Sequence, residues 1–183
     1  MTLVRDYDPR FLLMLIVNLC VYFLFLLLND AFAGISVYLF MPALLLVAPS
    51  LFLGRLGAVS MGLIFGFLYE ANAPVRFIGA NALIFALFCF AINFIRDKFR
   101  SLDPFAIMWL TWSANILIFT ACALFVYPRG MEYWQSYLAR LSVDILISSM
   151  FVMLFSSYAI NLHKSLCYLL GVDLSIENKE ESE

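Results

Sequence analysis

Residues 11–28 read FLLMLIVNLCVYFLFLLL and contain no charged side chain. A helix needs about 20 mostly apolar residues to cross the hydrocarbon core of a bilayer. In lipid, every backbone N–H and C=O needs an internal partner, and an apolar run satisfies that need by forming a helix. These residues therefore predict a first transmembrane helix. The run is longer than the apolar core of a signal peptide, so we expect it to remain in the mature protein.

The composition of the whole chain points the same way. Of its 183 residues, 64% are hydrophobic and 13% are charged, and the mean hydropathy is +0.96. Soluble domains carry about 25% charged residues. A domain of this size cannot hide so much apolar surface, so the excess must face lipid. The composition predicts an integral membrane protein rather than a soluble enzyme, and the net charge of −2 offers no basic surface for nucleic acid.

Short polar breaks divide the chain into six apolar segments. The predicted fold is all-α, a compact bundle of six transmembrane helices within residues 1–170, at about 10–28, 36–53, 56–70, 77–95, 104–127 and 141–160. Pro42 and Pro49 predict a bend in the second helix. The aromatic residues of segment 131–140 predict an interfacial stretch. Residues 171–183 are acidic and predict a disordered cytoplasmic tail.

The positive charges predict the orientation in the membrane. Eight of the eleven Lys and Arg residues fall on one side of the six predicted helices, and Arg76, Arg129 and Arg140 fall on the other. Because Lys and Arg are enriched in cytoplasmic loops, both termini are expected in the cytoplasm. An even number of crossings agrees with that expectation.

Small residues line one face of the third predicted helix. Ala58, Gly62 and Gly66 are four residues apart, and Gly62 and Gly66 form a GxxxG pattern. Such a face lets two helix backbones approach closely in lipid. Two interpretations stay open, packing inside the fold and docking of a partner helix.

Polar residues mark the break between the third and fourth predicted helices. Glu70, Asn72 and Arg76 are expected at the outer end of this hairpin. They predict either a polar contact site or a solvated loop with a weak local ion pair. Together with Gly62 and Gly66, Glu70 and Arg76 are the candidate partner-binding residues.

Two opposite charges, Arg140 and Asp144, lie at the start of the last predicted helix, and their spacing of four residues places them on one helix face. Ionisable residues within a membrane are costly and usually face the protein interior. The pair is therefore a candidate buried polar site, and the alternative is a self-neutralising pair at the membrane interface. The lone His163 is expected at the interface as well.

Amide side chains lie inside the predicted helices, at Asn18, Asn81, Asn93 and Asn115. They are expected to form interhelical hydrogen bonds. The chain has no sequence motif for a nucleotide, a catalytic serine or a metal, and its four cysteines lack a CxxC spacing. We therefore expect no catalytic residue, no metal and no cofactor.

The stretch 41–86 reads MPALLLVAPSLFLGRLGAVSMGLIFGFLYEANAPVRFIGANALIFA. A proline enters a leucine-rich helix, glycines precede and fill the next helix, and an acid and a later glycine follow. In this pattern the chain resembles the MreD family of rod shape-determining membrane proteins. The matching positions are Pro42, Gly57, Gly62, Gly66, Glu70 and Gly79.

The resemblance implies a non-enzymatic scaffold in the bacterial inner membrane. MreD-like proteins work with the bitopic protein MreC and with the transglycosylase and transpeptidase components of the rod complex, which builds lateral peptidoglycan. They are thought to share a fold with the substrate-binding subunits of energy-coupling-factor transporters. A vitamin-type transporter subunit, with a pocket lined by Asn81, Asn115 or Asp144, is therefore an alternative, and a membrane enzyme or assembly factor is a third.

Overall fold

The structure is a computed structural model that describes residues 9–72, 77–96, 103–125 and 134–171, without the side chains of 134–137. In these residues all of the regular secondary structure is helical. The helices are α1 (Pro9–Ala33), α2 (Pro42–Phe52), α3 (Arg55–Ala71), α4 (Ala80–Ile95), α5 (Pro104–Phe125) and α6 (Trp134–Leu169). Within the described part of the chain, three helical stretches are long and apolar enough to cross a membrane: Pro9–Ala33, Pro104–Phe125 and Leu138–Leu169.

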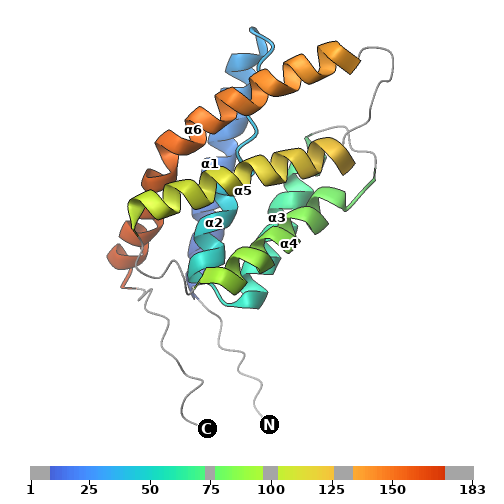
Figure 1. The fold of residues 1–183 in the computed structure, drawn as a ribbon. Coiled ribbons are helices and arrows are strands. Elements are labelled where there is room, and N and C mark those ends of the chain that lie inside the picture. Colours follow the sequence, from blue (N-terminus) through green and yellow to red (C-terminus); the bar gives the residue numbers. More distant parts are fainter. Residues whose placement is uncertain (1–8, 73–76, 97–102, 126–133, 172–183) are drawn as a thin grey trace.

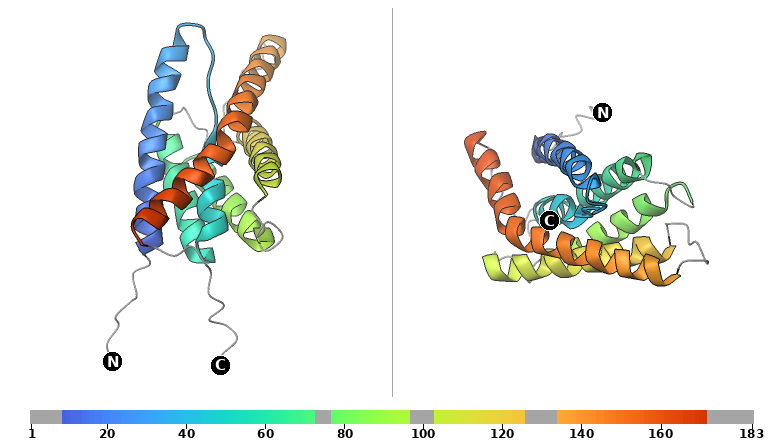
Figure 2. Two further views of the ribbon diagram at one scale, coloured as in Figure 1. Left: turned by 90° about the vertical axis from the view of Figure 1, so that its left-hand side faces the viewer. Right: turned by 90° about the horizontal axis from the view of Figure 1, so that it is seen from above.

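Helix α2 is the centre of the arrangement (Figure 1). It contacts each of the five other described helices, and all of its residues are buried. Helices α3 and α4 form a tightly packed hairpin on one side of it, and α5 and α6 pack against each other on another. The start of α1 and the end of α6 lie at the same end of the molecule (Figure 2).

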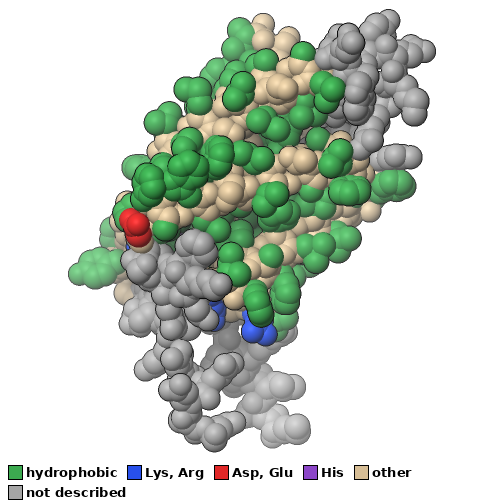
Figure 3. All heavy atoms as spheres, viewed as in Figure 1, with side chains coloured by type: hydrophobic (Ala, Val, Ile, Leu, Met, Phe, Trp, Pro, Cys, Tyr) green, Lys and Arg blue, Asp and Glu red, His purple; other side chains and the backbone are tan. Residues whose placement is uncertain are grey.

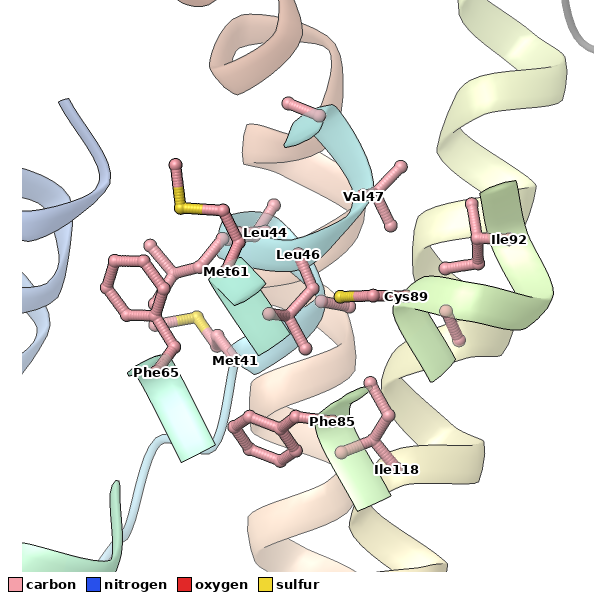
Figure 4. Packing of buried hydrophobic residues seen from close by; sticks show 14 of the residues in the cluster. Met41, Leu44, Leu46, Val47, Met61, Phe65, Phe85, Cys89, Ile92 and Ile118 are labelled. Atoms are coloured by element: carbon pink, nitrogen blue, oxygen red, sulfur yellow. The ribbon is translucent and has the colours of Figure 1, made fainter. Parts of the chain in front are cut away.

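The apolar core forms around α2 because its leucines are met by side chains from three neighbouring helices. Figure 4 shows Leu44, Leu46 and Val47 of α2 beside residues of α3, α4 and α5. Phe65 and Phe85 are fully buried in this cluster. Burying a side chain of this size stabilises the fold by about 1.5–3 kcal/mol.

The outside of the molecule is also apolar. Figure 3 shows hydrophobic side chains across the visible faces of α4, α5 and α6, with few charged side chains between them. Large apolar side chains more than half exposed include Leu27, Leu56, Leu83, Leu87, Phe94, Leu117, Leu146 and Leu154. A surface of this kind is stable in lipid and unstable in water.

The predicted connection between the first two helices was wrong at both of its ends. The first helix does not stop at residue 28, because Asn29 and Asp30 continue the helix to Ala33. The second helix does not start at residue 36, because 37–41 are not helical and run back alongside α1 toward Pro42 (Figure 2). The side chain of Asn29 forms hydrogen bonds with the backbone of Leu39 in this non-helical segment, so this polar residue does not mark a turn.

The other helix boundaries agree better with the predicted ones in the middle of the chain than at its end. Helices α3 and α5 start within one residue of their predicted positions, and α4 starts at Ala80 rather than at residue 77. Helix α6 is much longer than the predicted 141–160, and it includes part of the expected interfacial stretch. The predicted tail after residue 171 lies outside the described residues.

Candidate functional site

The buried helix α2 has backbone groups that its own short helix cannot satisfy. It has only 11 residues and contains Pro49, which has no N–H to give to the carbonyl four residues earlier. The segment 37–41 before it makes no regular helical bonds. Non-helical backbone buried in a membrane protein needs partners supplied by the surrounding protein. Side chains of the neighbouring helices supply these partners. We call this set the α2 collar, and its members are Asn18, Asn29, Asn93, Arg96, Asn115, Asp144 and Ser148.

The collar begins on α1 and α6. Asn29 binds Leu39 twice, accepting from its N–H at 2.7 Å and donating to its carbonyl at 3.0 Å. Asp144 accepts from the N–H of Tyr38 at 3.0 Å. These bonds join α1 and α6 to the same non-helical strip.

Phe40 is the next residue of the strip, and its backbone is bound by side chains of α6 and α5. Its N–H donates to Ser148 Oγ of α6 at 2.9 Å, and its carbonyl accepts from Asn115 Nδ2 of α5 at 3.0 Å. The other end of the Asn115 amide accepts from the N–H of Ala43 at 3.4 Å. Asn115 therefore completes the first turn of α2, where helix donors have no partners of their own.

The middle and the end of α2 are completed from α1 and α4. Asn18 Nδ2 donates to the carbonyl of Leu45 at 2.8 Å, which is the carbonyl that Pro49 leaves open. Asn93 Nδ2 donates to the carbonyls of Ser50 and Leu53 at 2.9 and 3.0 Å. Arg96 Nη1 donates to the same Leu53 carbonyl at 3.0 Å.

All four predicted amides make interhelical hydrogen bonds: Asn18, Asn93 and Asn115 bind backbone groups of α2 and its flanking residues, and Asn81 of α4 accepts from the thiol of Cys122 on α5. Sequence reasoning missed Asn29 and Ser148 as members of the collar. Pro49 in the second predicted helix was the available signal, because a proline inside a buried helix leaves a carbonyl that must find a donor elsewhere.

The predicted pair Arg140 and Asp144 separates in the structure. Asp144 is buried, at 8% exposed, and binds the N–H of Tyr38, whereas Arg140 is exposed. The expectation that Arg140 is a buried polar residue was therefore wrong. Although the two residues lie one turn apart on α6, Asp144 is buried in the bundle and Arg140 is exposed at its surface. A spacing of four residues therefore did not place both side chains at the same depth.

Replacing Arg140 by glutamine is expected to change the free energy of unfolding by less than about 0.5 kcal/mol, because the side chain is exposed. Asp144→Leu is expected to cost about 1–3 kcal/mol, because it leaves the Tyr38 N–H without its acceptor. Both changes can be measured by SDS titration of the purified protein in mixed micelles. Equal losses in the two variants would restore the ion-pair interpretation.

Gly62 and Gly66 lie inside the fold, against α4. A Cβ at Gly66 would sit 2.3 Å from Ala82 Cα, and one at Gly62 would sit 2.8 Å from Ala86 Cα. The backbone of α4 occupies the small-residue face, which gains dispersion contacts from the close approach. This face is therefore not open to a partner helix, and the interpretation of Gly62 and Gly66 as partner-binding residues was wrong.

Glu70 caps the start of α4 from the end of α3. Its two carboxylate oxygens accept from the N–H groups of Gly79 at 2.7 Å, Asn81 at 2.6 Å and Ala82 at 3.4 Å. Negative charge is stabilising at a helix N-terminus. Gly79 has a φ of 89°, which a residue with a side chain rarely adopts. Glu70 is thus committed to the hairpin, and Arg76 lies outside the described residues.

We expect Glu70→Ala to lower the free energy of unfolding by about 1–2 kcal/mol, because three N–H groups lose their acceptor at once. Glu70→Gln keeps one acceptor oxygen and is expected to lose less. Hydrogen exchange of the amides of Gly79, Asn81 and Ala82 should rise in the alanine variant. Unchanged exchange at these amides would contradict the capping role.

Comparison with known proteins adds no relative to this description. No family model matches the chain, no curated protein matches its sequence, and no solved structure matches its fold. Among the described residues, no group of three or more His, Cys, Asp or Glu side chains could hold a metal ion.

Proposed function

We propose that this chain is a multi-pass membrane protein that serves as a non-enzymatic scaffold for cell-wall elongation, as its resemblance to the MreD family implies. The observation that carries the proposal is the α2 collar. In transporters, interrupted helices point open backbone groups at a substrate. Here side chains from four neighbouring helices bind backbone groups before and at both ends of α2. Such an interior suits a rigid structural role.

The proposed topology has six crossings, with both termini in the cytoplasm of a bacterial inner membrane. Helix α2 alone is about 16 Å long at 1.5 Å per residue, which is short of a hydrocarbon core of about 30 Å. The five residues 37–41 add about 16 Å if they are extended. The strip and α2 together therefore have the length of one crossing, which supports keeping the second span.

We place the partner on the outward face of the α3–α4 hairpin. Leu83, Leu87, Phe90 and Phe94 follow one another on α4 at helical spacing, and their exposed fractions are 60%, 59%, 47% and 71%. Residues three and four apart form one stripe on a helix. The occupant that we propose is the single membrane helix of an MreC-like bitopic protein, because α3 and the first part of α4, up to residue 86, belong to the stretch that carries the family resemblance.

Co-purification tests this proposal. The chain is co-expressed with the MreC-like protein of the same genome and captured from detergent-solubilised membranes. We expect a stable complex, and the double variant Leu87→Ala, Phe90→Ala should reduce the yield of the partner about tenfold, the equivalent of 1.4 kcal/mol. The matched control is Leu117→Ala on α5, which is also apolar and exposed. No complex with the wild-type chain would overturn the proposed function, and equal loss in the control would overturn the docking face.

A substrate-binding subunit of a vitamin-type transporter is the second candidate, and Asn81 is the observation that favours it. Its side chain is fully buried and its Oδ1 accepts from the thiol of Cys122, but its Nδ2 has no hydrogen-bond partner in the described structure. A buried polar ligand could take this donor. Thermal stabilisation of the wild-type protein by such a molecule, and its loss in Asn81→Leu, would favour this function over the scaffold.

A further inference from the structure

An apolar cavity of about 180 Å³ lies between α1 and α6 and reaches the start of α2. Its walls come from residues within 21–28 of α1 and within 151–162 of α6, and Met41 and Leu44 form its floor. These two floor residues are only 1% and 4% exposed. The lining side chains are aliphatic or aromatic, so the cavity suits an apolar group rather than water, which needs several polar partners.

Polar contacts fix both walls at one end of the cavity. Asn18 of α1 donates to the Leu45 carbonyl of α2, and its Oδ1 lies 3.0 Å from Nε2 of His163 on α6. His163 is 2% exposed, so the expectation that it sits at the membrane interface was wrong. The contact between Asn18 and His163 instead brings α6 against α1 inside the fold.

The other end of the cavity is fixed as well. Asn29 of α1 and Ser148 of α6 bind backbone groups of the strip before α2. The cavity residues of α1 thus lie between Asn18 and Asn29, and those of α6 lie between Ser148 and His163. A void forfeits packing contacts along its lining. Because the walls are attached at both ends, they cannot close over this one, and an apolar guest would restore the contacts.

The cavity opens onto the apolar outer surface of the molecule. Leu24 and Tyr158 line it and are exposed, at 54% and 68%. The exposed side chains of Leu27 and Leu154, one turn away on the same helices, continue this surface. Val21 lies 12 residues after the start of α1, about 18 Å along the helix, so the cavity is at the depth of the hydrocarbon core in a membrane-spanning α1.

The occupant that fits this cavity is hydrocarbon from the bilayer. Lipid chains cover the apolar outer surface of a membrane protein, and the cavity is continuous with that surface. An apolar cavity of about 150 Å³ accepts benzene, whereas a helix is about 10 Å wide and does not enter so small a space. We infer that the cavity binds one acyl chain of a membrane phospholipid, which packs against Met41 and Leu44 at the start of α2.

Photolabelling of the whole protein tests this inference. The chain is placed singly in nanodiscs of phosphatidylethanolamine and phosphatidylglycerol, and a small share of the phospholipid carries a diazirine midway along one acyl chain. No second copy and no partner protein is present, so the result is independent of the proposed scaffold function. After irradiation, mass spectrometry identifies the labelled residues.

We expect label on Met41 or Leu44, because both are too buried to be reached from the outer surface. Leu51 is the internal control, since it is also buried on α2 but does not line the cavity, and it should stay unlabelled. Label on Tyr158 at the rim without label on Met41 or Leu44 would overturn the proposal. So would equal label on Leu51 and the two floor residues.

A pair of substitutions on α6 keeps the test specific. Ala159 lines the cavity, and Ala159→Phe places a ring in it, so label on Met41 and Leu44 should fall to the level of Leu51. Ala139→Phe makes the same change at an exposed position of α6 outside the cavity and should leave the label unchanged. If Ala159→Phe does not fold, the wild-type pattern decides alone. Undiminished label in a folded Ala159→Phe variant would contradict binding in this cavity.

Discussion

Replacing Gly66 by alanine is expected to destabilise the protein by about 3 kcal/mol, at the upper end of the cost of overpacking a core. The new methyl group would lie 2.3 Å from Ala82 Cα and 2.6 Å from Ala82 N, so the backbone of α4 would have to move. Gly62→Ala meets backbone atoms at 2.8 Å and should cost less. SDS titration of the purified variants measures the loss.

Gly34→Ala is the control for this series, because a Cβ at Gly34 meets nothing within 4 Å. Its expected change is within about 0.5 kcal/mol. The order of stability should be Gly34→Ala, then Gly62→Ala, then Gly66→Ala. If Gly66→Ala unfolds together with the Gly34 control, helices α3 and α4 do not approach as closely as the structure has them.

Replacing Asn115 by leucine is expected to cost about 3 kcal/mol, even though the two side chains are similar in size. The leucine leaves the Phe40 carbonyl and the Ala43 N–H without their partner in the buried core. Each unsatisfied buried group costs about 1–3 kcal/mol. The midpoint of thermal unfolding and SDS titration should both report the loss.

Thr120→Val is the control for Asn115→Leu, because it removes a polar group from the same helix at a position outside the collar. Thr120 lies on the same helix and is exposed, and its hydroxyl binds only the carbonyl of Ile116 in the preceding turn. Its replacement should change stability by less than about 0.5 kcal/mol. An Asn115→Leu variant as stable as Thr120→Val would show that the collar does not hold the start of α2.

The sequence alone predicted the helical class and the close approach of α3 to a neighbour, since both depend on local features. Residues 11–28 are apolar without interruption, and Gly62 and Gly66 repeat at the period of a helix. It could not tell whether the neighbour is α4 or another protein. That choice depends on which residues face the glycines, and Ala82 and Ala86 gave no distinctive signal.

The break before α2 could not be predicted from local sequence. Residues 36–53 form one uncharged and mostly apolar run, and such runs favour helices in lipid. The non-helical strip is stable because Asp144 and Ser148, which are remote in sequence, accept its N–H groups. The spacing of Arg140 and Asp144 likewise suggested an ion pair, because the sequence does not show that the Asp144 carboxylate accepts from the backbone N–H of Tyr38.

The α2 collar also constrains how the chain can be made. Asp144 and Ser148 are synthesised 106 and 108 residues after Tyr38 and Phe40, the groups that they bind. During translation those N–H groups must therefore bind water or other partners until α6 has been made. A nascent chain stopped after α5 would leave these two N–H groups without the acceptors that they have in the complete fold.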